Sequence, residues 1–190
     1  MDMASNYNNE TIPEFAEIIN SAKTKLSEVT IGEYGFFQFY KENGKEYSLN
    51  LSNLNPPIKL DHESKKDFKG LYILSDDGAV QYVGISKNVL LRIKQHFVSN
   101  SHYSASLVYL MALKEYEDKE RAKSKNEKYK YKGLRKDLPN FDNFRKKQQE
   151  LMRDRWRISF IPQGDSFHLH VLEAYAACEL KAKWNSFRTH

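Results

Sequence analysis

The stretch GLYILSDDGAVQYVGISKNVLLRIKQHF, residues 70–97, decides the fold of this chain. It begins with two short β-prone runs, residues 70–75 and 81–86, which flank the turn-forming string DDG of residues 76–78. After the second run, apolar residues recur at helical spacing instead. The sequence therefore predicts a β-hairpin followed directly by a helix over about residues 88–99.

Four polar side chains with useful chemistry lie on these elements. Tyr72 falls in the first run and Tyr82 in the second, while Arg92 and His96 are four residues apart and share one helix face. Two phenols, a guanidinium and an imidazole can thus converge beside the hairpin. Such groups can bind a phosphodiester, neutralise its charge and move a proton.

The order of these residues resembles the GIY-YIG nuclease family. Gly-Leu-Tyr at residues 70–72 stands for the first tripeptide of that family, and Tyr-Val-Gly at 82–84 for the second. The family pattern continues with an arginine on the first helix, a glutamate on a later helix and an asparagine beyond it. Arg92, Glu173 and Asn185 occupy those places.

A narrower resemblance points to the restriction-endonuclease-type members. His96 matches this subset, and the strings LEAY at 172–175 and KWN at 183–185 look like its last helix and tail. The likeness covers about residues 70–115 and 155–190.

The resemblance implies an α/β (α+β) core in which a small three-stranded antiparallel sheet is flanked by helices. Periodicity gives the same order of strand, strand, helix, helix, strand and helix, with the third strand at residues 157–161. We expect residues 67–190 to form this core, with a basic insertion at about 118–152. Residues 1–66 read as an N-terminal extension of one helix plus a β-hairpin.

Local signals define that extension and the insertion further. A capping box at residues 11–14 predicts where the first helix begins. Residues 34–40 and 46–51 are expected to pair across Asn43-Gly44, a strong hairpin signal. Residues 119–140 are rich in lysine and lose periodicity, which suggests a mobile loop or weak helix. The last helix is expected to be capped by Asp165-Ser166.

Composition narrows the class of protein. The chain has 190 residues, 40% of them hydrophobic, and its single cysteine, Cys178, excludes an intrachain disulfide. No apolar run reaches the roughly 18 residues of a membrane helix, and the first residues lack the pattern of a signal peptide. We therefore expect a cytoplasmic protein with no membrane partner.

Charge is distributed unevenly along the chain. Residues 70–190 carry 22 Lys and Arg against 14 Asp and Glu, whereas residues 1–69 carry 8 Lys against 11 acids. Every arginine lies at or beyond Arg92, and the stretch 119–157 accounts for the positive excess. Because arginine and lysine neutralise backbone phosphates, the expected partner is double-stranded DNA.

Ten basic residues of this stretch are candidates for nucleic-acid binding. They are Lys123, Lys125, Lys128, Lys130, Lys132, Arg135, Lys136, Arg145, Lys146 and Lys147. The alternative is a solvated lysine-rich linker without dedicated contacts.

The resemblance also implies roles at the catalytic positions. Glu173 would be the metal ligand, and one carboxylate plus water and substrate phosphate suits Mg²⁺, with Mn²⁺ expected to substitute. Arg92 would pair with the phosphate oxygens, and His96 would donate to phosphate or assist proton transfer. Tyr72 would deprotonate the attacking water, and Tyr82 would align the water or the phosphate. A phenol can act as this base near neutral pH only where nearby cations lower its pKa.

Asn185 is expected to play a structural part in the site. It follows Glu173 by twelve residues, about 18 Å along a helix, and so cannot share the same metal. We expect the helix to end near Lys183 and the Asn185 side chain to bond to backbone beneath the site.

Other interpretations remain open. His168, His170 and Glu173 suggest a transition-metal cluster, although no zinc motif accompanies them. A repair or mobile-element nuclease that recognises DNA structure would share the same core, as would a catalytically silent nucleic-acid-binding module. Since each chain has one site, cutting both strands requires either a homodimer or two successive nicks.

Overall fold

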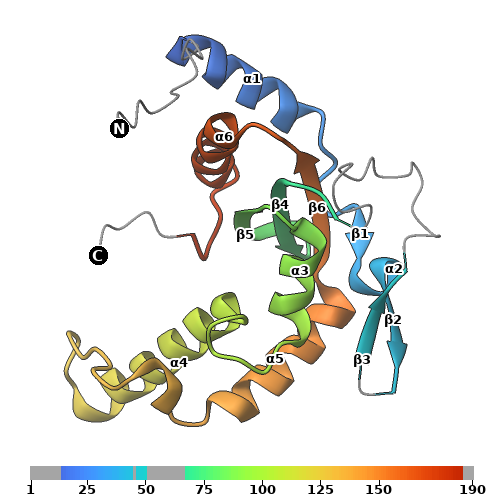
Figure 1. Ribbon diagram of the computed structural model, residues 1–190. Coiled ribbons are helices and arrows are strands. Elements are labelled where there is room, and N and C mark those ends of the chain that lie inside the picture. The colour runs from blue at the N-terminus through green and yellow to red at the C-terminus, as the bar shows by residue number, and fades with distance from the viewer. Residues whose placement is uncertain (1–13, 45, 51–66, 186–190) are drawn as a thin grey trace, which may run out of the picture.

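The computed structural model describes residues 14–44, 46–50 and 67–185, which form a mixed α/β fold (Figure 1). The elements are α1 Phe15–Ser27, β1 Tyr34–Gly35, α2 Phe36–Phe39, β2 Tyr40–Asn43, β3 Glu46–Leu49, β4 Gly70–Asp76, β5 Ala79–Ser86, α3 Val89–Val98, α4 Ser106–Ser124, the 3₁₀ turn η1 Arg135–Asp137, α5 Phe141–Arg155, β6 Arg157–Pro162 and α6 Ser166–Glu179. Among these described helices, none combines the length and the apolar character needed to cross a bilayer.

The central sheet has the strand order β1-β6-β4-β5, and every neighbouring pair is antiparallel. The predicted antiparallel sheet of β4, β5 and β6 is confirmed, with β4 in the middle. The turn between β4 and β5 uses Asp77 and Gly78 at positive φ, as the DDG string predicted. The short strand β1 adds a fourth member at the outer edge of β6, where Tyr34 pairs with Ile158.

Alternation along β4 divides the core between the two faces of the sheet. Tyr72 and Leu74 lie in one buried cluster with residues of α3 and α2, whereas Leu71 and Ile73 lie in the other with residues of α6. The helix α1 packs on α6, so the two lie together at one end of the molecule in Figure 1, opposite α4 and α5.

The helix α3, which carries Arg92 and His96, is fixed at both ends by other segments. At its beginning the buried carboxylate of Asp67 accepts hydrogen bonds from the Leu90 and Leu91 amides at 2.8 and 2.9 Å. At its end the Gln149 side chain donates to the His96 and Ser99 carbonyls. These bonds satisfy backbone groups that a helix leaves unpaired at its ends, and they fix the helix axis relative to the sheet.

The N-terminal hairpin differs from expectation in its first strand. The predicted strand at 34–40 is wrong, because residues 36–39 form the helical turn α2 and the hairpin strand β2 begins at Tyr40. Helical spacing lets Phe36 and Phe39 both enter the core at 0% exposure, which strand alternation would not allow. The Asn43-Gly44 turn is confirmed, with Gly44 at φ +63°. The predicted capping box lies outside the described residues apart from Glu14.

The lysine-rich segment is more ordered than its sequence suggests. The helix α4 continues to Ser124, where the loss of apolar periodicity had predicted a mobile loop or weak helix. Pairs at i,i+4 spacing, such as Arg121 with Glu117, support the extra turns. The chain then turns back along α4, where the Tyr131 amide donates to Glu117 and Arg121 donates to the Tyr129 carbonyl. The other predicted helices and strands are confirmed, including the Asp165 cap of α6.

Candidate active site

Three rings from three elements meet on one face of the sheet. Tyr72 of β4, Tyr82 of β5 and His96 of α3 have ring centroids 5.6 to 6.1 Å apart. The Tyr72 hydroxyl and His96 Nε2 form a hydrogen bond of 2.8 Å. The predicted convergence of these three side chains is therefore confirmed.

The glycines of both tripeptides are explained by close approach. A Cβ on Gly84 would lie 2.5 Å from the Tyr72 hydroxyl oxygen and 2.7 Å from Cε1 of Tyr82. A Cβ on Gly70 would lie 2.5 Å from the Ile161 carbonyl oxygen on the neighbouring strand. The absence of a side chain at Gly84 leaves room for two tyrosines on one face of the sheet. The absence of a side chain at Gly70 lets β4 lie close to β6.

Arg92 is held beside the rings by the segment that leads into α4. Its Nη1 donates to the Ser104 carbonyl and to Gln95 Oε1, both at 2.9 Å, and its Nη2 donates to the Ser106 hydroxyl at 2.6 Å. Its positive charge opposes the protonation of His96 and lowers the pKa of both phenols. The guanidinium is thus held in a fixed position.

His96 is fully buried behind Tyr72. Burial first, and the charge of Arg92 second, lower the pKa of His96 to about 3, so the imidazole is neutral near pH 7. Its Nδ1 has no hydrogen-bond partner among the residues that the structure describes. A neutral ring at 0% exposure does not reach a phosphate in this conformation, and the ring hydrogen bond that it forms within the described residues is to Tyr72.

Burial dominates the two phenols as well. It raises the pKa of Tyr72 well above 10 and also raises that of Tyr82, and the opposing effect of Arg92 is smaller. Catalysis by a phenolate would require a lowered tyrosine pKa, and the protein by itself does not lower it. The reason is that Tyr72 is 1% exposed and its hydroxyl already bonds to a neutral imidazole.

Glu173 of α6 lies within electrostatic reach of this cluster. Its negative charge raises the pKa of both Tyr72 and Tyr82, and burial raises its own pKa. Within the described residues its carboxylate forms no side-chain hydrogen bond or ion pair. A partly buried carboxylate without a direct partner is a suitable place for a cation.

The geometry offers little to a transition-metal cluster. His168 binds the carboxylate of Asp165 at 2.8 Å, as part of the cap of α6. In the described parts of the chain, no three side chains of His, Cys, Asp and Glu gather closely enough to hold a metal. A metal at Glu173 would therefore rest on one protein carboxylate.

Asn185 bonds to backbone, as the sequence predicted. Its Oδ1 accepts from the Val83 amide at 2.8 Å and its Nδ2 donates to the Val83 carbonyl at 2.6 Å. The Trp184 amide donates to the Gln81 carbonyl, so residues 183–185 cover the outer edge of β5. The helix α6 ends at Glu179, earlier than expected, and the tail brings Asn185 back between Tyr82 and Gly84.

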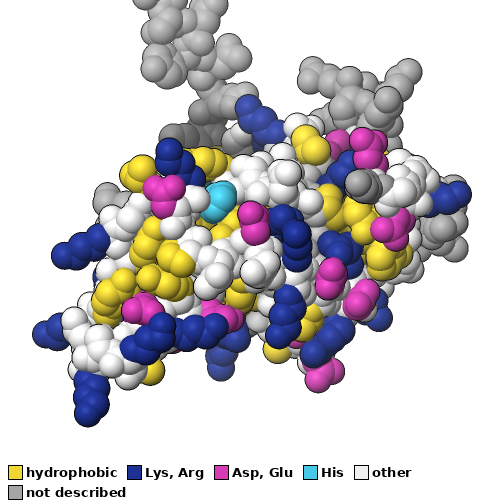
Figure 2. Space-filling view, turned by 90° about the horizontal axis from the view of Figure 1, so that it is seen from below, with side chains coloured by type: hydrophobic (Ala, Val, Ile, Leu, Met, Phe, Trp, Pro, Cys, Tyr) yellow, Lys and Arg dark blue, Asp and Glu magenta, His cyan; other side chains and the backbone are white. Residues whose placement is uncertain are grey.

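The ten candidate DNA-binding residues fall into two groups. The two arginines are held by contacts within the protein: Arg135 stacks on Tyr109 at 4.1 Å, and Arg145 donates to Gln149 and Asp142. The eight lysines are exposed at the end of α4, on the following segment and on α5. Figure 2 shows the face with α4 and α5, where lysine and arginine side chains interleave with acidic ones.

Sequence reasoning missed the residues that hold α3 in place. Asp67 caps a helix that begins 22 residues later, and Gln149 reaches α3 from more than 50 residues away, so neither lies in a local capping pattern. Ser106, which fixes Arg92, resembles any serine at a helix start. Only the three-dimensional contact identifies such residues.

The comparisons with known proteins agree with this geometry. Residues 68–140 match the family model of the GIY-YIG catalytic domain, a span that contains Tyr72, Tyr82, Arg92 and His96. Glu173 and Asn185 lie beyond it. No curated protein and no solved structure matches the chain. Through residues 68–140 the protein thus carries a match to the GIY-YIG catalytic domain, which indicates an endonuclease.

Proposed function

We propose that the protein is a metal-dependent endonuclease that hydrolyses phosphodiester bonds in double-stranded DNA, of the sequence-specific restriction type. The observation that carries this proposal is the meeting of Tyr72, Tyr82 and His96 on one face of the sheet, within the electrostatic reach of Arg92 and Glu173. Each group has a place in phosphodiester hydrolysis.

Arg92 stabilises the charge that builds on the phosphoryl oxygens. Because Ser104 and Ser106 hold its guanidinium, the charge is oriented before substrate binds, and little reorganisation is needed in the transition state. A lysine at this position would keep the positive charge but would lose the planar set of N–H donors that forms these hydrogen bonds.

Glu173 is the residue that would hold Mg²⁺, or Mn²⁺ in its place. The donor set fits, because a hard oxygen ligand lies half-buried and, among the described residues, forms no hydrogen bond or ion pair; His170 is the basic group that acts on it electrostatically. When bound, the ion would polarise the phosphoryl group and stabilise the leaving oxygen.

Tyr72 and His96 form a pair suited to move a proton. The neutral imidazole accepts a hydrogen bond from the Tyr72 hydroxyl at Nε2, which leaves the lone pairs of the Tyr72 oxygen able to accept a hydrogen bond from the attacking water. Tyr82, which lies diagonally across the hairpin from Tyr72, orients the water or the phosphate. Since both phenol pKa values are raised, the active phenolate is scarce near pH 7 and increases with pH.

The restriction type rests on residues around this core. Arg92 and His96 occur together, and the tail places Asn185 against the Val83 backbone. The helix α1 and the hairpin of β2 and β3 enlarge a small core, and such additions provide surface for base recognition. A chain with one site cuts both strands as a homodimer or in two nicks.

Cleavage of supercoiled plasmid tests the proposal. The wild type, Glu173→Gln and the matched control Glu179→Gln, which changes an exposed glutamate of the same helix, are compared with Mg²⁺, Mn²⁺ or EDTA. We expect discrete fragments from the wild type and the control, and none from Glu173→Gln or with EDTA. Nicking or smearing would favour a structure-guided nuclease, and binding without cutting would identify a catalytically silent module.

A further inference from the structure

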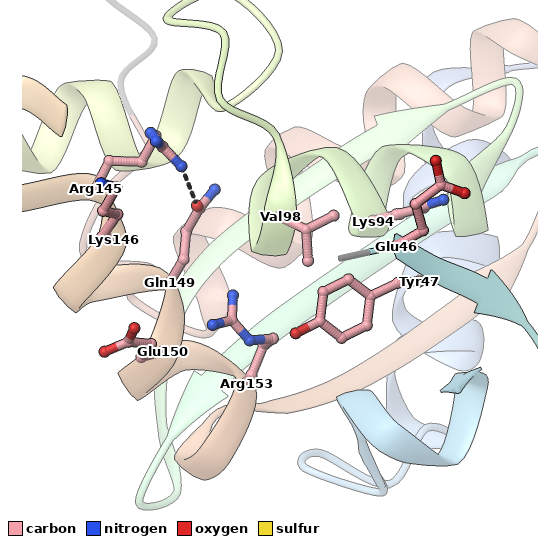
Figure 3. A pocket seen from close by; sticks show the side chains of 9 residues that line it. All are labelled: Glu46, Tyr47, Lys94, Val98, Arg145, Lys146, Gln149, Glu150 and Arg153. Carbon is pink, nitrogen blue, oxygen red and sulfur yellow. Dashed lines mark hydrogen bonds between the residues drawn. The ribbon is translucent and has the colours of Figure 1, made fainter. Parts of the chain in front are cut away.

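A second cationic site lies on the other side of the catalytic helix. A cavity of about 450 Å³ opens between β3, α3 and α5 (Figure 3). Its lining includes Lys94, Arg145, Lys146 and Arg153 against two acids, Glu46 and Glu150. We call this cavity the α3–α5 cleft.

The cleft is separate from the candidate active site. Lys94 is two residues from both Arg92 and His96 on α3, which places it about 200° around the helix from each. Val98, one turn beyond Lys94, lines the same cleft. A ligand here would touch the opposite flank of α3 from the one that carries the catalytic groups.

Two guanidinium groups in the cleft are held in place. Arg153 donates to the Phe97 carbonyl at 2.9 Å and lies 5.6 Å from the centre of the Tyr47 ring. Figure 3 shows these two side chains facing each other in the middle of the cleft. Arg145 donates to Oε1 of Gln149, whose amide nitrogen is already engaged by the His96 and Ser99 carbonyls. Because Gln149 is 2% exposed, this support is rigid.

These features select an oxyanion. Guanidinium groups match phosphate oxygens, and groups that are already ordered lose little entropy on binding. The volume lies in the range of pockets that hold whole small ligands, so it admits more than a bare ion. Lys146 on the rim adjoins Lys147, one of the exposed lysines of α5, so the positive surface continues outward along that helix.

We propose that the α3–α5 cleft binds a backbone phosphate of the nucleic-acid substrate, at a position away from the bond that is cut. This inference rests on the proposed function. Lys94 and Lys146 are the outer contacts and Arg153 is the inner one. The cleft therefore holds the duplex against α3 from the flank that the catalytic groups do not occupy.

The salt dependence of duplex binding tests this site without cleavage. Fluorescence anisotropy with a labelled duplex in EDTA gives the affinity of the wild type and of Lys94→Gln/Lys146→Gln over a range of KCl. Each lost phosphate contact lowers the slope of log K against log salt by about 0.9, which is about eightfold in affinity at 0.1 M. We expect the double variant to lose one such contact.

The control is Lys41→Gln, an exposed lysine on the opposite face of the same hairpin from Tyr47. Equal slopes for the double variant and this control, with wild-type binding intact, would overturn the inference alone. Absence of duplex binding by the wild type would overturn the proposed function as well. Titration with inorganic phosphate distinguishes a phosphate of the duplex backbone from free phosphate. If the wild type binds inorganic phosphate tightly, and Lys94→Gln abolishes this binding but leaves the duplex affinity unchanged, the cleft binds free phosphate and the inference is refuted.

Discussion

The substitution Gly84→Ala tests whether the second tripeptide needs glycine because two tyrosines occupy the space above it. The new Cβ would lie 2.5 Å from the Tyr72 hydroxyl oxygen and 2.7 Å from Tyr82 Cε1, closer than real side chains approach. The Tyr72 ring is 1% exposed, so it cannot swing into solvent without opening the core. We therefore expect it to shift and to lose its bond to His96.

The expected cost follows from these two effects. Overpacking a core costs about 1–3 kcal/mol, and the lost hydrogen bond adds about 1 kcal/mol. The free energy of unfolding should fall by about 2–4 kcal/mol, which for a chain of this length lowers the Tm by about 4–16 °C. Urea denaturation followed by circular dichroism measures this change directly.

A second glycine provides the control. Gly164 has no atom within 4 Å of its would-be Cβ, so Gly164→Ala should change the unfolding free energy by less than about 1 kcal/mol. A Gly84→Ala variant within about 0.5 kcal/mol of this control would refute the packing argument. Adding Tyr72→Phe removes the nearest oxygen, so the double variant should lose less than the sum of the two single variants.

Four further predictions follow from the charges and hydrogen bonds of the site. The folded pKa of His96 is about 3 against 6.5 in a free chain, so its stability contribution is present above pH 6.5 and is lost as pH falls. Between pH 6.5 and 5 the wild type should lose about 2 kcal/mol more than His96→Gln in urea unfolding, and equal losses would contradict the buried neutral imidazole. The cleavage rate, under conditions where chemistry is limiting, should rise from pH 7 to 9.5 because both phenol pKa values are raised, and a flat profile would exclude a phenolate base. Asn185→Ala should cost about 1–2 kcal/mol and speed hydrogen exchange of the Val83 amide, whereas Asn185→Asp, which keeps the acceptor, should preserve much of that protection. Changing four exposed lysines to glutamine should weaken duplex binding and reduce the dependence of the affinity on salt; the four are Lys125, Lys128, Lys130 and Lys132. An unchanged affinity at low salt would reject the lysine-rich segment as a DNA contact.

The sequence predicted the core elements because their signals are local. The hairpin of β4 and β5, the helix α3 and the cap of α6 each follow from turn residues, periodicity or a capping residue within a few positions. The same spacing predicted that Tyr72, Tyr82 and His96 would meet. Tyr72 and Tyr82 are diagonal neighbours on one face of the paired strands, and the helix that carries His96 follows the second strand directly.

What the sequence could not supply depends on distant contacts. The turn α2 forms because Phe36 and Phe39 both find space in a core built mainly by later residues. The segment after α4 is ordered by Glu117, which accepts from the Tyr131 amide after the chain reverses. The pKa of a tyrosine depends on how deeply the fold buries it, and a sequence motif does not indicate the depth of burial.

The support of α3 by Gln149 and Arg153 has a consequence for exchanging segments of this fold. Both residues belong to α5: Gln149 lies in the predicted insertion of about residues 118–152, and Arg153 directly follows it. Both side chains nevertheless bind carbonyls at the end of α3, the helix that carries Arg92 and His96. The predicted insertion is therefore not structurally independent of α3. A chimera that exchanges this segment with that of another protein would have to carry Gln149 and Arg153 with it, because they hold the end of α3. The exposed lysines of the segment, in contrast, can be changed one by one without altering these hydrogen bonds.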